Sequence, residues 1–367
     1  MIWIFILFLI LVLAWLADRN VLNGKKIYLL ALILVLSYIV GFWGPSAQDH
    51  PGYADKFNSY KEFSQLSGYN GGMQSRENNT EIAFAFINIL ANKLGLGEAG
   101  FFFLIAFFVN TVIIVYVYKH HQPVLALFYL FATGFFFQEA NLVRQYIAAA
   151  IFILAIPFLM DRKYLKYSLL ILLASLFHTS SIILFVFLVF FFDKNEKVEK
   201  YMRYGIFALW IGSVLITFRL ISVDLLKIVS SFDYYSVYAS DDNAIGMEFG
   251  TASILIYNAL SVFVIFYAFN RYKLMSSILI ISSAIMNISV VYPNISRMIY
   301  FFAAINAVYI VQLTVNKIYN TNLARRLSSV ANVMIVCFCV FRFLTAVAFN
   351  PDNKFGTITY SLSDFFK

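Results

Sequence analysis

Charged residues are scarce in this 367-residue chain: Asp, Glu, Lys and Arg make up 13% of it, whereas hydrophobic residues make up 62%. A soluble domain carries about twice that charged fraction. The bilayer must therefore be the solvent for most of the chain. Cysteine is also scarce, because Cys337 and Cys339 are the two present. They lie in one apolar segment, exclude a disulfide framework and are expected to be packing residues.

The chain also lacks a basic cluster interleaved with aromatic residues in a soluble segment. Its net charge of +8 therefore does not indicate nucleic-acid binding. The basic residues lie in short loops between apolar segments, as is typical of cytoplasmic loops in membrane proteins. No Lys or Arg precedes the apolar stretch at Met1, so we expect a retained first helix rather than a cleaved signal peptide.

Apolar segments predict an all-α fold, a polytopic transmembrane helical bundle of about eleven segments in a single domain over residues 1–367. These segments are 2–17, 27–44, 100–118, 123–138, 141–160, 167–192, 204–220, 251–269, 274–291, 297–313 and 329–347. Residues 81–97 have a helical pattern with polar interruptions, which predicts an interfacial helix. We expect residues 45–97 to form a first outer loop plus this helix, and 221–250 to form a second outer loop.

Loop charges predict the orientation and one reversal of the chain. The bases of loop 18–26 place it in the cytoplasm. The acidic stretch 221–250 falls outside only if segment 167–192 goes out and comes back, with its turn near Phe177 to Ser181. Each half would be ~18 Å long at 1.5 Å per residue, too short for a ~30 Å hydrocarbon core. The alternative is one long helix, with another segment miscounted.

Four arginines interrupt apolar segments, and the predicted topology places all of them in the outer half of the membrane: Arg144, Arg219, Arg297 and Arg342. An ionised side chain at the bilayer centre costs roughly 2.5 kcal/mol or more. Such residues therefore indicate function, although Arg219 and Arg342 lie near helix ends and could instead reach the headgroups. Asn141, Arg144 and Gln145 share one helical face by their spacing, which predicts a polar stripe.

Further polar residues are expected at the same face. His178 could be a hydrogen-bonded break between two half-helices, or a general base that works near neutral pH. Asp49, Tyr53 and Asp55 lie either in a solvated loop with a turn at Pro51-Gly52 or in a stretch that binds sugar hydroxyls, supplies a base or holds a metal. The chain has no His or Cys spacing typical of a metal site, so we expect no metal. Because arginine forks bind phosphate, the set favours a phosphate-bearing lipid substrate.

Two short motifs carry a family resemblance. Asn141-Leu142-Val143-Arg144-Gln145-Tyr146-Ile147-Ala148 is followed about thirty residues later by Leu176-Phe177-His178-Thr179-Ser180-Ser181. In this order the pair resembles the EpsG-like family of Wzy-type polysaccharide polymerases. The stretch from Asp49 to Asp55 with Glu81 downstream, and the stretch Ile295-Ser296-Arg297-Met298-Ile299-Tyr300, look like two further family elements. The resemblance covers about residues 1–345.

The resemblance implies a multi-pass enzyme of the bacterial inner membrane. Such enzymes join oligosaccharide repeat units carried on undecaprenyl diphosphate, release undecaprenyl diphosphate and make the O-antigen of lipopolysaccharide, capsule or exopolysaccharide. It also implies an architecture related to the GT-C glycosyltransferases, no cofactor, and three kinds of partner: lipid-linked oligosaccharides, membrane lipids and a protein that regulates chain length.

The resemblance also implies roles for individual residues. Arg144 and Arg297 would grip the donor diphosphate, with Arg219 and Arg342 as further candidates. His178 would deprotonate or orient the acceptor hydroxyl, unless Asp49 is the base. The candidates for sugar binding are Tyr53, Asp55, Glu81, Asn141, Gln145 and Tyr300.

Three other functions compete with this one. A flippase or transporter of lipid-linked sugars would need charges at several depths of the membrane. A different outer-leaflet transferase, either an O-antigen ligase or an acyltransferase, would use a similar set of arginines and a histidine. A structural membrane subunit would need neither.

Overall fold

The computed structural model describes residues 2–43, 49–69, 80–120, 122–192, 196–220, 251–315 and 322–348, and helices are the regular elements that these residues form. The chain divides into two compact units. The first consists of Met1–Leu188, Ile310–Asn316 and Val330–Lys367, and the second of Val189–Tyr309 and Lys317–Ser329. Helices α14 (Ala303–Val315) and α15 (Asn322–Ala348) have residues in both.

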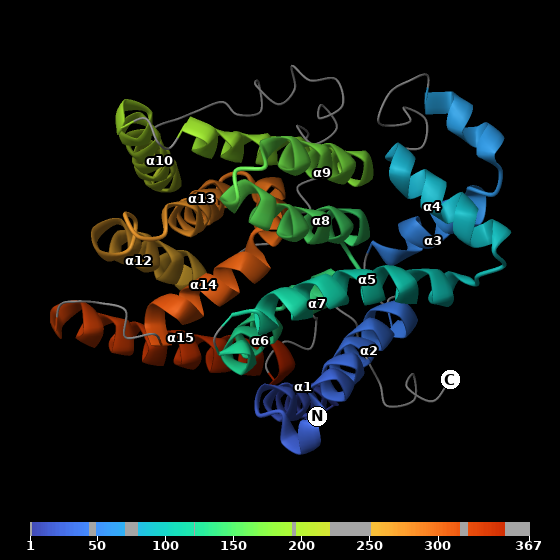
Figure 1. The fold of residues 1–367 in the computed structure, drawn as a ribbon, viewed down its shortest axis with the longest axis horizontal. Helices are drawn as coiled ribbons and strands as arrows, with labels where there is room; N and C mark the ends of the chain where they lie inside the picture. The colour runs from blue at the N-terminus through green and yellow to red at the C-terminus, as the bar shows by residue number, and fades with distance from the viewer. Residues whose placement is uncertain are drawn as a thin grey trace. The chain divides into compact units, whose positions relative to one another are not determined.

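The first unit contains most of the helices (Figure 1). In chain order they are α1 (Ile2–Asp18), η1 (Val21–Asn23), α2 (Lys25–Trp43), α3 (His50–Ser59), η3 (Phe63–Tyr69), α4 (Ile82–Lys93), α5 (Glu98–Tyr118), α6 (Pro123–Ala132), α7 (Phe135–Gln138), α8 (Val143–Met160), α9 (Tyr164–Phe177) and the start of η4 (Thr179–Phe192). Helices α2 and α5 pack especially closely, because a Cβ atom at Gly41 would lie 2.6 Å from the Phe103 Cα.

The predicted segment 123–138 is broken into α6 and α7. Gly134 lies between these helices with a φ of +84°, a left-handed conformation that glycine adopts without steric cost. The short helix α7 ends at Gln138, and α8 begins at Val143.

The chain reverses direction at His178, as the loop charges predicted. Helix α9 ends at Phe177, His178 is extended, and η4 begins at Thr179. The Tyr167 hydroxyl donates to the Leu184 carbonyl at 2.6 Å, although these residues are 17 positions apart. One straight helix would separate them by ~25 Å at 1.5 Å per residue. The predicted turn of the chain near His178 is therefore confirmed and the single long helix is excluded, whereas the path of this segment relative to the membrane stays a prediction.

The first predicted outer loop contains a helix that the sequence analysis missed. Pro51 lies in the first turn of α3, so the alternative of a solvated loop with a turn at Pro51-Gly52 is excluded. Proline is well suited to that position because the first turn does not use its missing N–H. The Asn92 amide on α4 donates to the Phe57 carbonyl at 2.7 Å and to the Tyr60 carbonyl at 3.1 Å, which fixes α3 against α4.

The predicted interfacial segment 81–97 is helical over Ile82–Lys93, but its polar side chains contact protein. Asn88 is buried, and its amide donates to the Phe84 carbonyl at 2.6 Å. His50 at the start of α3 contacts Glu98 at the start of α5, with 3.1 Å between Nε2 and Oε1. Helices α3, α4 and α5 are therefore tied together by side chains at their ends.

The second unit contains α10 (Glu196–Thr217), α12 (Thr251–Tyr267), α13 (Lys273–Ser289) and η7 (Pro293–Phe301). Asn258 on α12 and Asn287 on α13 exchange two side-chain hydrogen bonds of 2.7 and 3.1 Å. Asn287 also donates to the Ser213 hydroxyl on α10 at 3.0 Å, so one amide network links three helices. The predicted second outer loop, 221–250, lies outside the described residues.

Four helices of the described part are long and apolar enough to cross a membrane. They are Lys25–Phe42, Glu98–Tyr118, Val143–Met160 and Asn322–Thr345, and the bent pair Ile295–Phe301 and Ala303–Val315 makes a fifth if it forms one span. Every one of the eleven predicted apolar segments contains helix. The prediction of an all-α, polytopic membrane bundle is therefore confirmed, whereas the single domain and the GT-C relationship stay predictions.

Candidate functional site

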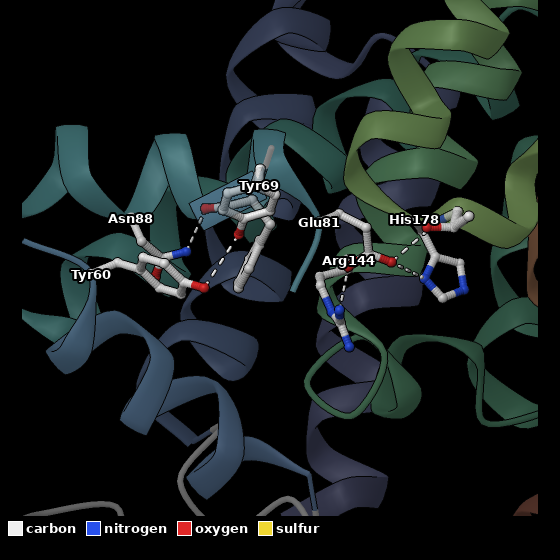
Figure 2. Close-up of polar contacts among 8 residues, drawn as sticks. Tyr60, Tyr69, Glu81, Asn88, Arg144 and His178 are labelled. Carbon is white, nitrogen blue, oxygen red and sulfur yellow. Dashed lines mark hydrogen bonds and ion pairs between the residues drawn. The ribbon is translucent and has the colours of Figure 1, made fainter. Parts of the chain in front are cut away.

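A buried carboxylate organises the polar residues of the first unit. Glu81 precedes α4, with its side chain 2% exposed. Its Oε2 accepts a hydrogen bond from Nη1 of Arg144. Its Oε1 lies 3.4 Å from Nδ1 of His178 and accepts the backbone N–H of Thr179 at 3.2 Å. Figure 2 shows the carboxylate between the arginine and the histidine.

The helix pattern explains why these residues meet. Arg144 is the second residue of α8, and His178 follows the last residue of α9. These helices lie side by side and are joined at their other ends by a short turn (Figure 1). The start of α8 and the end of α9 therefore lie at the same end of the pair. Glu81 reaches that end because α4 contacts α9.

The environment keeps Glu81 ionised. Burial raises the pKa of its carboxyl, but His178, the positive charge of Arg144 and the Thr179 N–H together lower that pKa further, to about 2. A carboxylate that accepts several hydrogen bonds and faces cations is expected to behave in this way. Glu81 is therefore a fixed negative charge that holds a cation on one oxygen and an imidazole on the other.

A second cation lies beside this cluster. The Tyr53 ring on α3 is within reach of two cations, with the Arg144 Cζ 5.6 Å and the Lys56 Nζ 5.8 Å from its centroid. Burial, followed by the positive charge of Arg144, lowers the pKa of Lys56 to about 8, against the opposing effects of Glu81 and Asp49. The sequence analysis missed Lys56 because Tyr53 and Lys56 share a face only if their segment is a helix.

The remaining candidates near α3 have different surroundings. The Asp49 N–H donates to the Asn141 side chain at 3.2 Å, and Asn141 in turn donates to Gln138 at 3.2 Å. Asn141 and Gln145 are buried, at 5% and 3% exposed, but Asn141 precedes α8, so the prediction that it shares a helical face with Arg144 and Gln145 is wrong. Asp55 is exposed on α3. Two of the predicted sugar-binding residues therefore contact the Arg144 side chain: Glu81 through its carboxylate and Tyr53 through its ring.

The other predicted arginines lie on separate elements. Arg219 is exposed just beyond the end of α10, with a φ of +54°. Arg297 and the buried Tyr300 lie on η7, which together with Arg219 belongs to the second unit. Arg342 is half-buried on α15, in the part that belongs to the first unit. The pairing of Arg144 with Arg297 around one diphosphate stays a prediction.

Metal-binding groups do not cluster in the part of the chain that the structure describes. No group of three or more His, Cys, Asp and Glu side chains within those residues could hold a metal ion. The cluster instead offers two cations, one imidazole and a buried carboxylate, which suit a phosphate-bearing substrate and a proton transfer.

The chain was compared with known proteins. The sequence profile of the EpsG family matches residues 26–362, nearly the whole chain. No curated protein matches the chain, and no solved structure matches it. The profile covers both motifs that carry Arg144 and His178. The chain therefore belongs to the EpsG family, whose members are Wzy-type polysaccharide polymerases.

Proposed function

We propose that this membrane polymerase joins oligosaccharide repeat units carried on undecaprenyl diphosphate, at the non-cytoplasmic face of the bacterial inner membrane. The growing chain passes from its lipid diphosphate to the terminal sugar of the incoming unit. The observation that carries the proposal is the Glu81 carboxylate, which holds Arg144 and His178 at the end of α8 and α9.

The chemistry follows from the charges of the cluster. The bond between the donor sugar C1 and the diphosphate oxygen breaks, and that oxygen keeps the electron pair. A new bond forms between C1 and the acceptor hydroxyl oxygen, whose proton passes to His178. Undecaprenyl diphosphate departs as an anion, and a fixed cation at this position stabilises the developing charge.

His178 is suited to receive the acceptor proton. With a proton on Nδ1, which faces Glu81 at 3.4 Å, its Nε2 carries the lone pair that a general base needs. Glu81 then acts as a positioning residue that fixes the ring and its tautomer, a different role from the sugar binding predicted from sequence. Asp49, whose backbone is held by Asn141, is the alternative base.

Two cations of the first unit are proposed to bind the diphosphate. The planar guanidinium of Arg144 can donate two parallel hydrogen bonds to phosphate oxygens. The ammonium group of Lys56, which also contacts the Tyr53 ring, adds a second positive charge. Arg297, Arg219 and Arg342 are proposed as further anion-binding residues. The proposed sugar-binding residues are Tyr53, Asp55, Asn141, Gln145 and Tyr300, and a chain-length regulator is the proposed protein partner.

The polysaccharide ladder of a deletion strain that carries plasmid-borne variants tests the proposal. We expect Arg144→Ala to abolish long polymer while single repeat units are still attached to their final acceptor. Arg144→Lys keeps the charge but loses the fork, so we expect a strong loss there too. Arg326→Ala is the matched control, because Arg326 is an exposed arginine on α15.

The same ladder distinguishes the competing functions. Loss of a ligase leaves every unit unattached, and loss of a flippase leaves no unit on the outer side. Long chains in the Arg144→Ala strain, at wild-type levels of the protein, would refute the assignment of Arg144 to the diphosphate.

A further inference from the structure

An apolar groove lies beside the charged cluster in the first unit. It has a volume of about 600 Å³, and its walls come from α4, α5, α8 and α9. Every side chain that lines it is apolar. Leu90, Leu154 and Leu173 in its walls remain 41%, 44% and 42% exposed, so the groove is open along one side. Such a surface binds hydrocarbon and offers nothing to a sugar hydroxyl.

The groove and the cluster share helix faces. On α8, Arg144 is followed by Ile147, Ile151 and Leu154, at spacings of three, seven and ten residues that place them on one face. The apolar lining thus begins ~4.5 Å along the axis from Arg144, at 1.5 Å per residue. On α9, the lining residue Phe177 directly precedes His178. The groove therefore starts at the charged cluster.

This arrangement matches a ligand with an anionic head joined directly to one apolar chain. A polyprenyl diphosphate has that form, because its hydrocarbon begins at the phosphate ester oxygen. A phospholipid separates its phosphate from two chains by glycerol, and therefore does not place hydrocarbon within one helical turn of the cation. We propose that the groove holds the isoprenoid units of the donor lipid nearest to the diphosphate, a proposal that rests on the proposed function.

The position of the groove also indicates which of the two lipid-linked substrates it binds. Arg144 is proposed to hold the leaving diphosphate, so the lipid in the groove is the donor rather than the acceptor. Its volume is that of a small-molecule pocket, so it takes part of the chain and leaves the remainder in the bilayer. Hydrocarbon contacts along α8 and α9 then fix the diphosphate at Arg144 through many small contributions.

Two neighbouring leucines on α9 provide a matched pair of variants. Leu173 lines the groove and is 42% exposed, whereas Leu172 is 41% exposed and is not part of the lining. The variant Leu173→Trp fills the groove, and Leu172→Trp adds the same bulk to another face of α9. Purified full-length protein in phosphatidylglycerol nanodiscs is titrated with undecaprenyl diphosphate, and inorganic pyrophosphate serves as the head-group probe.

We expect Leu173→Trp to weaken undecaprenyl diphosphate binding at least tenfold and to leave pyrophosphate binding unchanged. Leu172→Trp should match the wild type with both probes, and Arg144→Ala should lose both. Leu154→Trp, which fills the groove from α8, replaces Leu173→Trp if that variant does not reach wild-type levels in the membrane.

Other outcomes overturn the inference. Equal undecaprenyl diphosphate binding by Leu173→Trp and Leu172→Trp would show that the groove is not used, while polymer made by the wild type would leave the proposed function intact. Loss of co-purified phospholipid rather than polyprenyl lipid from Leu173→Trp would assign the groove to membrane lipid. No undecaprenyl diphosphate binding by the wild type would instead refute the proposed function.

Discussion

Arg144 and Glu81 form an ion pair across 63 residues of sequence, with side chains 15% and 2% exposed. The charge of Arg144 is therefore balanced by a residue of the protein itself. Removing one partner of a buried pair leaves the other charge uncompensated, at a cost of about 3–5 kcal/mol. Stability and substrate binding are consequently linked at Arg144, and the experiments must separate them.

A double-mutant cycle separates the two roles. Glu81→Gln keeps the shape of the side chain but leaves the Arg144 charge unpaired, so we expect a lower melting temperature and little polymer. Glu81→Gln with Arg144→Gln removes both charges and should recover much of the melting temperature, because no unpaired charge remains. Polymer should stay absent in the double variant because the cation is gone. Recovery of polymer along with stability would show that the pair is merely structural.

Acid should destabilise the protein through Glu81. Its pKa in the folded state is lowered to about 2, so the ionised carboxylate stabilises the fold above the usual carboxyl pKa of 4.5. That contribution is lost as the pH falls from 4.5 to 2, and it amounts to about 3 kcal/mol at 1.36 kcal/mol per pKa unit. Thermal unfolding in detergent across this range measures it. Glu81→Gln should be less sensitive to pH there, and an identical acid dependence in both proteins would contradict the assignment.

Lys56 should give activity an alkaline limit. Because its pKa is lowered to about 8, the amine loses its charge as the pH rises through 8 and can no longer pair with the diphosphate. We expect the kcat/KM of the wild type to fall there, and Lys56→Arg to remain active at higher pH because arginine stays protonated. Lys61→Arg, at an exposed lysine beyond the end of α3, is the control.

The stability of the protein should respond to Lys56 in the opposite direction. The unfolded chain binds a proton at this amine up to about pH 10.5, whereas the folded chain releases it near pH 8. The free energy of unfolding should therefore rise between pH 8 and 10.5. If kcat/KM and stability fell together in this range, the loss of activity would be due to unfolding rather than to Lys56.

The sequence predicted the elements better than their contacts. Apolar segments identified the helices because a helix that lies in the bilayer needs a long stretch of apolar side chains. Loop charges also predicted the reversal at His178. Helix α3 was missed because its ten residues are mostly polar, and its apolar side chains Tyr53 and Phe57 are buried against neighbouring helices. Local hydrophobicity does not encode that packing.

The organisation of the site was less accessible from the sequence. Arg144 and His178 were selected as polar interruptions of apolar segments, a local property. Glu81 was selected only through the family resemblance, and its contacts with Arg144 and Thr179 join residues 63 and 98 positions apart. Such contacts depend on the packing of α4 against α9. A sequence pattern therefore indicates which residues are costly to bury, but not which partner compensates each of them.

The reversal at His178 should depend on Tyr167. Its hydroxyl donates to the Leu184 carbonyl at 2.6 Å and joins the two arms of the hairpin. Tyr167→Phe leaves that carbonyl without its donor, at a cost of about 1 kcal/mol. We expect faster amide hydrogen exchange in residues 179–188 and a modest fall in melting temperature. Tyr201→Phe is the control, because Tyr201 is 71% exposed. Unchanged exchange after Tyr167→Phe would show that packing alone, such as the stacking of Phe152 on Phe187 with centroids 5.8 Å apart, holds the hairpin closed.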